Sequence, residues 1–406
     1  MVGARHAVPL LLLLCCHQLL HAAEPESSVI TPDAATRDAF GQFANLLDTL
    51  QKHYVEPAKI QTGSQTREAL RAFVRALDAD ADYLSPEEAD AAKAPPDKDT
   101  GDIGLTVALR DNIMTVVTPL DGSTAQTAGL LGGEQIIALN SQPTLPMSPR
   151  EFSTQLRGPI GTSVVLTLFD PETNTTRALA IERAAPAVVE PLKLKFLSNG
   201  IAYIRLSRFS VASVEQLLTQ VKRAEEDRAK GMIIDLRNNP GGTLDAVLGA
   251  ARLFVPAKAV MLSLEHAGEK RRVTFTSDDS RKFSAPVVVL VNGGTAAEAE
   301  VFAAALRDQQ RARLVGSKTF GRGRHSASFP LPNGGVVVLP TALYLPPSKK
   351  PFHNTGLPPD IDVSLARDSE RKLAAAGLGT FDWINDKSQM LATDLPLARA
   401  LDLLAK

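Results

Sequence analysis

The sequence predicts a multidomain protein of the α/β and α+β classes, with an N-terminal helical region, a small β-rich domain and an α/β core. Three patterns support this prediction. Apolar residues recur at helical spacing before residue 77, short β-type runs separated by Gly, Pro and Asn follow between residues 101 and 183, and strands alternate with helices from residue 201 onward. The chain has 406 residues and is 44% hydrophobic, which is enough to bury two or more cores.

Residues 1–23 have the pattern of a secretory signal peptide. The basic start of the chain precedes an apolar run at residues 7–16, and a short stretch ending at Ala23 leads to the expected cleavage site. We therefore expect export to a periplasm or to the extracellular medium. A retained N-terminal anchor is the alternative, because Leu20 or His21 would stand where a small residue is preferred.

Composition excludes several classes of site. Cys15 and Cys16 are the two cysteines and both lie in the signal segment, so the mature chain would have no disulfide, no cysteine nucleophile and no thiolate metal site. The net charge of -1 argues against a nucleic-acid partner, and membrane contact is expected only if the N-terminal segment is retained. The seven histidines show no HExxH or paired spacing, and no phosphate loop is present, so we expect no metal and no cofactor.

The N-terminal helical region is expected to span residues 24–98. Apolar residues at three- and four-residue spacing predict a helix with one buried face over residues 33–54, and a second helix is expected at residues 64–77. The stretch 89–100 is rich in Ala, Asp, Lys and Pro and contains Pro95-Pro96, which indicates a linker.

The β-rich domain is expected to span residues 99–184. Residues 117–130 and 133–140 resemble the central part of a PDZ domain, a module that adds an extended C-terminal peptide as a strand to a sheet edge. The resemblance implies a carboxylate-binding loop and first strand at Ile103-Gly104-Leu105-Thr106, with a helix at residues 149–156 as the other wall of the groove. The alternative is a PDZ fold that packs against its neighbour and binds nothing. The four β-type runs are residues 105–109, 114–118, 135–139 and 164–169.

The α/β core is expected to span residues 185–365, and the helical tail residues 366–406. Its alternating pattern predicts a mostly parallel buried sheet covered by helices. The tail contains helical spacing at residues 395–404. The strands are expected at residues 202–206, 232–236 and 287–291, and the helices at residues 214–230, 244–254 and 299–309.

A tight turn, Asn239-Pro240-Gly241-Gly242, stands between a buried strand and a helix. Such a turn presents backbone N–H groups at a helix N-terminus and favours an anion. The alternative is that the glycines only permit the tight turn.

Six strings together resemble the C-terminal processing peptidases, a family of serine peptidases also called tail-specific proteases. The resemblance implies a helical region, a PDZ domain and a crotonase-like α/β peptidase core in this order, with Gly241 and Gly242 helping to form the oxyanion hole. The strings are residues 54–57, 83–88, 156–162, 234–242, 319–323 and 356–361.

Three catalytic positions of that family carry unsuitable residues here. The register set by Glu300 places Ala297 at the nucleophile, the string Thr319-Phe320-Gly321-Arg322-Gly323 places Arg322 at the general base, and Ser326 stands where a glutamine orients that base. A methyl group has no oxygen to attack with, and a guanidinium stays protonated and only donates hydrogen bonds. Losing the nucleophile alone costs a serine protease a factor of roughly 10⁶ in turnover.

The sequence therefore predicts a pseudopeptidase that binds peptide or protein C-terminal tails without hydrolysis. One alternative is a serine-type endopeptidase with a displaced site that uses Thr295 or Ser317 as nucleophile and Lys318 or His325 as base. Another alternative is a structural protein that assembles with itself or with a partner.

Arg322 itself allows two interpretations. A fixed cation near the Gly241 and Gly242 amides could hold a peptide carboxylate. Alternatively, its guanidinium pairs with a neighbouring acid such as Glu298 or Glu300.

Overall fold

The computed structural model describes residues 33–93, 99–145, 147–186, 192–266, 271–278, 283–378 and 393–405. The predicted signal peptide, residues 1–23, lies outside these ranges, as do residues 94–98 of the predicted linker. Within the described ranges, no helix has the length and hydropathy needed to cross a membrane. The chain divides into two compact units, residues 1–68 and residues 69–406.

The first unit contains helix α1 (Ala34–His53), the short helix η1 (Pro57–Lys59) and the start of α2 (Thr62–Leu77). Asp33 caps α1 by accepting a hydrogen bond from the Thr36 N–H at 2.7 Å. Both predicted helices are confirmed. The predicted buried face of α1 is wrong, because no residue of this helix is buried and Phe40 is 64% exposed.

The second unit begins with the remainder of α2, strand β1 (Asp82–Leu84) and helix α3 (Pro86–Ala91). Ser85 and Glu88 form a capping box at the start of α3. The same Glu88 carboxylate accepts two hydrogen bonds from the buried Arg71, at 2.8 and 2.9 Å. Helix α3 occupies the start of the stretch expected to be linker.

The β-rich segment, residues 99–186, contains an antiparallel sheet with strand order β3-β4-β5-β8-β9, and β6 pairs with β5. The four predicted β-type runs are confirmed as strands β3, β4, β5 and β8. Strand β3 stands at one end of this order, and helix α5 (Pro149–Leu156) packs beside it. The other elements are β2 (Thr100–Gly101), β3 (Leu105–Arg110), β4 (Ile113–Pro119), α4 (Thr124–Thr127), β5 (Gln135–Leu139), β6 (Gln142–Pro143), β7 (Gly158–Pro159), β8 (Ser163–Asp170) and β9 (Thr175–Glu182).

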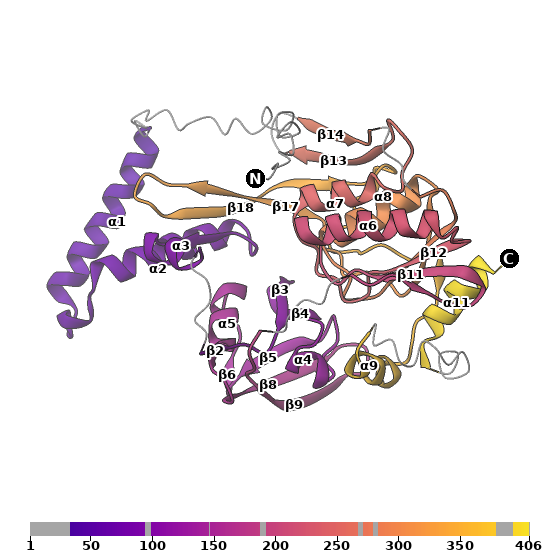
Figure 1. Ribbon diagram of the computed structural model, residues 1–406. Helices are drawn as coiled ribbons and strands as arrows, with labels where there is room; N and C mark the ends of the chain where they lie inside the picture. Colours follow the sequence, from indigo (N-terminus) through magenta and orange to yellow (C-terminus); the bar gives the residue numbers. More distant parts are fainter. Residues whose placement is uncertain are drawn as a thin grey trace, which may run out of the picture. The chain divides into compact units, whose positions relative to one another are not determined.

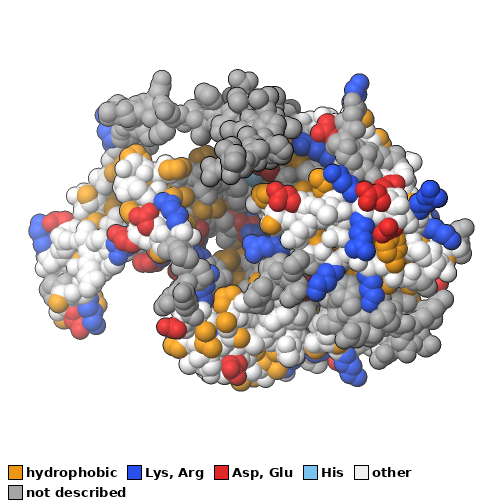
Figure 2. All heavy atoms as spheres, in the orientation of Figure 1, with side chains coloured by type: hydrophobic (Ala, Val, Ile, Leu, Met, Phe, Trp, Pro, Cys, Tyr) orange, Lys and Arg blue, Asp and Glu red, His pale blue; other side chains and the backbone are white. Residues whose placement is uncertain are grey.

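The surface of this segment carries apolar side chains. Figure 2 shows orange side chains gathered over the area that Figure 1 labels β2, β5 and β6. Ile137 of β5 is exposed, as are Leu145 and Ile160, which follow β6 and β7.

The core sheet has the order β10-β11-β12-β15-β16-β19, and all of its neighbours are parallel except β10 and β11. Helices α6, α7 and α8 lie on one face and α11 on the other (Figure 1). This arrangement confirms the predicted mostly parallel, helix-covered sheet. The elements are β10 (Lys195–Phe196), β11 (Ile201–Arg205), α6 (Val211–Glu226), β12 (Gly231–Asp235), α7 (Leu244–Ala251), β15 (Val287–Val291), α8 (Glu298–Asp308), β16 (Ala312–Gly316), β19 (Ile361–Asp362) and α11 (Leu395–Leu404).

A second sheet was not anticipated from the sequence. It has the order β1-β18-β13-β14, and β17 also pairs with β18 as a long hairpin. Helix α9 (Arg367–Ala376) follows the core sheet. Besides β1, the strands of the second sheet are β13 (Val260–His266), β14 (Arg272–Thr276), β17 (Arg324–Pro330) and β18 (Val336–Leu345).

Candidate active site

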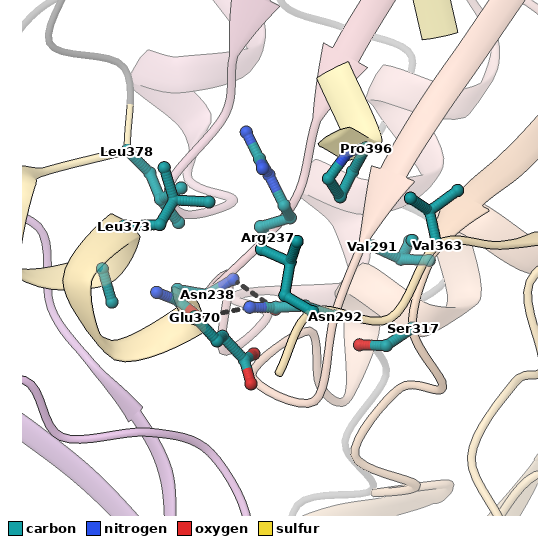
Figure 3. Close-up of a pocket in the computed structure, with 13 residues that line it drawn as sticks. Arg237, Asn238, Val291, Asn292, Ser317, Val363, Glu370, Leu373, Leu378 and Pro396 are labelled. Atoms are coloured by element: carbon teal, nitrogen blue, oxygen red, sulfur yellow. Dashed lines mark hydrogen bonds between the residues drawn. The ribbon is translucent and has the colours of Figure 1, made fainter. Parts of the chain in front are cut away.

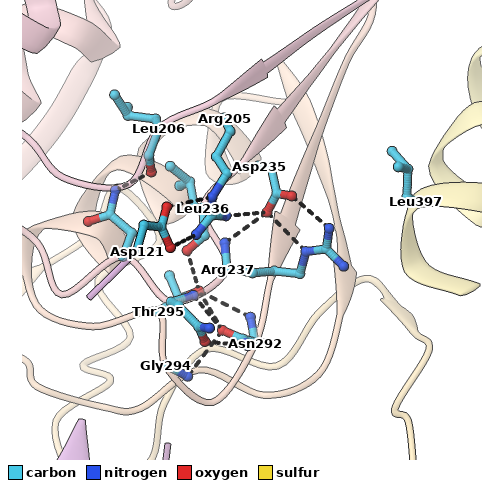
Figure 4. A network of polar contacts seen from close by, with 12 residues as sticks. Asp121, Arg205, Leu206, Asp235, Leu236, Arg237, Asn292, Gly294, Thr295 and Leu397 are labelled. Carbon is cyan, nitrogen blue, oxygen red and sulfur yellow. Dashed lines mark hydrogen bonds and ion pairs between the residues drawn. The ribbon is translucent and has the colours of Figure 1, made fainter. Parts of the chain in front are cut away.

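The segment between β15 and α8 forms a turn fixed by buried polar contacts. The Asn292 side-chain oxygen accepts hydrogen bonds from the Asn238 N–H at 2.9 Å and the Gly294 N–H at 3.1 Å. The Thr295 hydroxyl donates to the Leu236 carbonyl at 2.8 Å and accepts from the Asn292 N–H at 3.0 Å. Thr295 is fully buried, so its hydroxyl is a structural element of this turn (Figure 4) rather than a free nucleophile.

Ala297 ends the turn in an unusual backbone conformation. Its φ is 52° and its ψ is -122°, a backbone conformation that residues other than glycine rarely adopt. Its N–H donates to a carboxylate oxygen of Glu300 at 2.9 Å. The predicted nucleophile position is therefore held rigidly at the start of α8, and it carries a methyl group.

Glu300 joins this turn to the loop before β17. Besides Ala297, its carboxylate accepts hydrogen bonds from the Gly321 and Arg322 N–H groups, both at 2.8 Å, and from the Thr319 hydroxyl. Burial raises the pKa of Glu300 to about 7, although these four donors act in the opposite direction. Glu300 thus fixes the predicted nucleophile position, Ala297, and the predicted base position, Arg322, relative to each other.

Arg322 is attached to Glu300 through its backbone and not through its side chain. Within the described residues, its guanidinium forms no ion pair with Glu298 or Glu300. The positive charge of the guanidinium acts against the rise in the pKa of Tyr344. The predicted base position therefore holds a half-buried cation whose charge opposes the rise in the pKa of Tyr344.

Ser326 lies on β17 rather than in the turn. It pairs with Pro340 of β18, next to an irregularity in the register, and it is exposed. His325, the residue before it, is half-buried and places its Nδ1 atom 3.3 Å from the Tyr344 hydroxyl oxygen.

The Gly241-Gly242 turn adjoins Ala297. Gly241 has a φ of +100°, and a Cβ placed there would lie 3.1 Å from the Ala297 Cβ. The Gly241 N–H donates to the Asn239 side chain at 2.9 Å. Helix α7 begins just beyond, capped by Thr243.

Two residues that the sequence did not single out as a pair complete the site. Tyr344 on β18 donates its hydroxyl proton to one carboxylate oxygen of Glu298, at 2.7 Å. The other oxygen of Glu298 accepts the Gly242 N–H at 3.2 Å. Burial and the neighbouring Glu298 charge raise the pKa of Tyr344, so the phenol stays protonated and donates. Burial lowers the pKa of His325.

The predicted peptide-binding residues lie at the start of β3. Gly104 has a φ of +71°, and a Cβ there would lie 2.4 Å from the Ser123 Cβ. Its N–H donates to the Asp102 side chain at 2.8 Å. Ile103 and Leu105 are buried, and Thr106 is half-buried.

Strand β3 also contacts the loop that carries Arg322. The Arg110 guanidinium lies over the Phe320 ring, 4.2 Å from its centroid, and donates a hydrogen bond to the Phe320 carbonyl. Ala108, Val117, Ala296 and Phe320 form one buried apolar cluster.

A small cavity lies beside this region, not within it. Its volume is about 30 Å³, close to the space of one water molecule, and it is lined by the carboxyl ends of β12, β15 and β16 together with α9 (Figure 3). Ser317, the second candidate for a displaced nucleophile, lines this cavity, and Ala297 and Arg322 do not.

Comparison with known proteins identifies the family. The model of peptidase family S41 matches residues 200–363. The chain is 32% identical to a carboxyl-terminal-processing protease of Synechocystis sp. over 77% of this chain and 74% of that protein. It is 30% identical to the corresponding protease of Picosynechococcus sp. over 80% and 75%. The solved structure of a photosystem II D1 C-terminal processing protease matches with a TM-score of 0.69 at 23% identity, covering 82% of this chain and 96% of that one. The chain therefore belongs to the carboxyl-terminal-processing proteases of peptidase family S41.

Proposed function

We propose that this family member is a pseudopeptidase, which binds peptide or protein C-terminal tails and does not cut them. One observation carries the proposal. The strained turn beside Gly241, where the family's nucleophile would stand, holds the methyl group of Ala297. The family's general base would stand at Arg322, whose guanidinium carries only N–H donors and has no lone pair to accept a proton.

A displaced nucleophile has little support from the geometry. The Thr295 hydroxyl is buried and makes two hydrogen bonds within its own turn. Ser317 lies on the separate small cavity. His325 places its Nδ1 atom against the Tyr344 hydroxyl, which already donates to Glu298. Among the residues that the structure describes, the hydroxyl against this ring is a phenol and not a serine or threonine nucleophile.

The β-rich segment is the tail-binding module in this proposal, and we infer that residues 99–184 form a PDZ domain. The position of β3 at the end of the sheet order supports this inference, because an unpaired sheet edge accepts a peptide as a further strand. Helix α5 beside β3 would form the other wall of the groove. The names of the relatives indicate carboxyl-terminal processing, which supports C-terminal tails as the ligand class.

Export is the remaining part of the proposal. Residues 1–23 are proposed to direct the chain to a periplasm or the extracellular medium and then to be removed. The N-terminal sequence of the protein recovered from these compartments tests this directly. A chain that begins at Glu24 supports the proposal, and a protein found only inside the cell contradicts it.

The decisive experiment measures binding and hydrolysis together. The purified protein is incubated with casein and with peptides that end in a free carboxylate, and cleavage is followed by mass spectrometry while binding is followed by calorimetry. We expect binding of the free-carboxylate peptides and weaker binding of the same peptides as C-terminal amides, with no cleavage of either substrate. Hydrolysis by the natural protein would overturn the proposal.

A further inference from the structure

The Glu298 carboxylate occupies the anion-binding side of the Gly241-Gly242 turn. One of its oxygens accepts the Gly242 N–H at 3.2 Å. A Cβ at Gly241 would lie 2.5 Å from the same oxygen, so only glycine leaves room for the carboxylate here. The Gly242 N–H therefore donates to an acidic side chain of the same protein and not to an external anion.

Tyr344 holds Glu298 in that position. Its hydroxyl donates to the second Glu298 oxygen at 2.7 Å, and Tyr344 is fully buried. The ring is stacked on Phe352 with centroids 6.5 Å apart, and its backbone pairs with Leu264 of β13. Because the phenol cannot turn away without disturbing the second sheet, the Glu298 side chain is restrained at both oxygens.

We propose that Glu298 is an internal carboxylate ligand of the Gly241-Gly242 turn, and that it excludes external carboxylates and oxyanions from this site. The inference rests on the proposed function, and it adds a block to catalysis that is independent of Ala297 and Arg322. An incoming anion would have to displace a hydrogen-bonded carboxylate and would meet its charge. Tails would therefore bind at β3 and not at the peptidase turn.

The Gly242 amide offers a direct test by NMR with acetate as the probe. When glycine is labelled with both ¹³C-carbonyl and ¹⁵N, only amides in Gly-Gly pairs show the carbonyl coupling, and the chain has such pairs at residues 132–133, 241–242, 293–294 and 334–335. The amides of Gly133, Gly294 and Gly335 then serve as internal controls.

We expect acetate to leave the Gly242 signal of the natural protein unchanged and to shift it in the Glu298→Ala variant. The apparent affinity of this amide for acetate should rise at least about tenfold, which corresponds to losing a charge-assisted competitor. The Glu265→Ala variant, which removes a partly exposed carboxylate paired with Arg272, should behave like the natural protein. Equal responses of Gly242 in the natural and Glu298→Ala proteins, including no response in either, would overturn the inference. The Glu298→Gln variant replaces Glu298→Ala if the latter does not fold, with the same expectation in direction.

A second measurement tests the consequence for catalysis. The Ala297→Ser, Arg322→Lys variant is treated with a fluorophosphonate, with and without the added Glu298→Ala change. In labelling, the introduced serine oxygen bonds to phosphorus, the P–F bond breaks, fluoride leaves and the introduced lysine takes the proton. We expect labelling to be at least about tenfold faster when Glu298 is absent. Equal labelling rates count against the inference. Cleavage of casein by the natural protein would instead defeat the proposed function, so the two failures are distinguishable.

Discussion

Ala297 holds a backbone conformation that residues other than glycine rarely adopt, and its side chain is a methyl group. This conformation costs a residue other than glycine on the order of 1–3 kcal/mol, so surrounding contacts must hold Ala297 in it. Glu300 provides that restraint, because it binds the Ala297 N–H and the loop of Arg322 with one carboxylate. Glu300 therefore supports the geometry of the turn through backbone N–H groups, and these contacts do not involve the side chain of residue 297.

The raised pKa of Glu300 predicts a dependence of stability on pH. Its pKa is about 7 in the folded protein against an ordinary value of 4.5, so between these values the folded state binds more protons than the unfolded state. Below about pH 4.5 the protonation of Glu300 thus contributes about 3 kcal/mol to the free energy of unfolding. This contribution is lost as the pH rises through 7.

Urea unfolding of the natural protein and of the Glu300→Gln variant at pH 5 and pH 7 measures this contribution. The variant lacks the titrating group, so the stability advantage of the natural protein over it should shrink between the two pH values. An advantage that stays constant or grows with pH would contradict the assignment. Other ionisable groups titrate in both proteins and cancel in the comparison.

At the scale of elements, the core sheet was predictable and the second sheet was not. Strands such as β15 are buried at every residue, and an uninterrupted apolar run indicates a parallel strand between two helical layers. Strand β17 is largely exposed and includes Arg324, His325 and Pro330, so its sequence carries no burial signal. Its pairing with β18 depends on contacts that periodicity does not record.

The same difference between buried core strands and exposed strands explains which parts of the site could be predicted from the sequence. The adjacency of Ala297 and Gly241 could be expected, because both turns follow neighbouring parallel strands, β15 and β12, at the same edge of the sheet. The contact between Glu298 and Tyr344 joins residues 46 positions apart, and one of them lies on an unpredicted strand. The sequence indicates Glu298 only as a possible partner for Arg322. The nearest sequence signal was an acidic residue directly after the nucleophile position.

The start of β3 carries a prediction at this scale. The Gly104→Ala change places a Cβ 2.4 Å from the Ser123 Cβ at a φ of +71°, which should distort the loop and weaken binding of free-carboxylate peptides by tenfold or more, about 1.4 kcal/mol. Gly161 offers a matched control, because it has a φ of +84° with nothing within 4 Å of an added Cβ.

Calorimetry with the same peptide compares the two variants. The Gly161→Ala variant should keep the natural affinity, since its backbone strain is similar but its position is open. Equal loss of affinity in both variants would mean that strain alone, and not the loop of β3, determines binding. Unchanged affinity in Gly104→Ala would place the tail elsewhere.

At the scale of the whole second unit, buried ion pairs join the β-rich segment to the core. Arg205 at the end of β11 binds Asp121 with two hydrogen bonds, at 2.7 and 2.8 Å, and lies 3.5 Å from Asp235 (Figure 4). Asp235 is already occupied by Arg237 and Tyr203. The pKa of Arg205 is raised by its two acidic partners in spite of burial, so the cation depends on both of them.

The Asp121→Asn change should therefore destabilise the protein well beyond what a surface ion pair would. Loss of one partner leaves a buried guanidinium with incomplete compensation, which commonly costs 3–5 kcal/mol; since Asp121 is itself partly exposed, we expect about 2 kcal/mol. The Glu265→Gln change removes a comparably short but more exposed pair with Arg272 and should cost less than about 1 kcal/mol. Urea unfolding followed by circular dichroism measures both. Because the lost contact links the β-rich segment to the core, the Asp121→Asn transition should also broaden, and two equally small and equally sharp shifts would show that this pair does not couple the two parts.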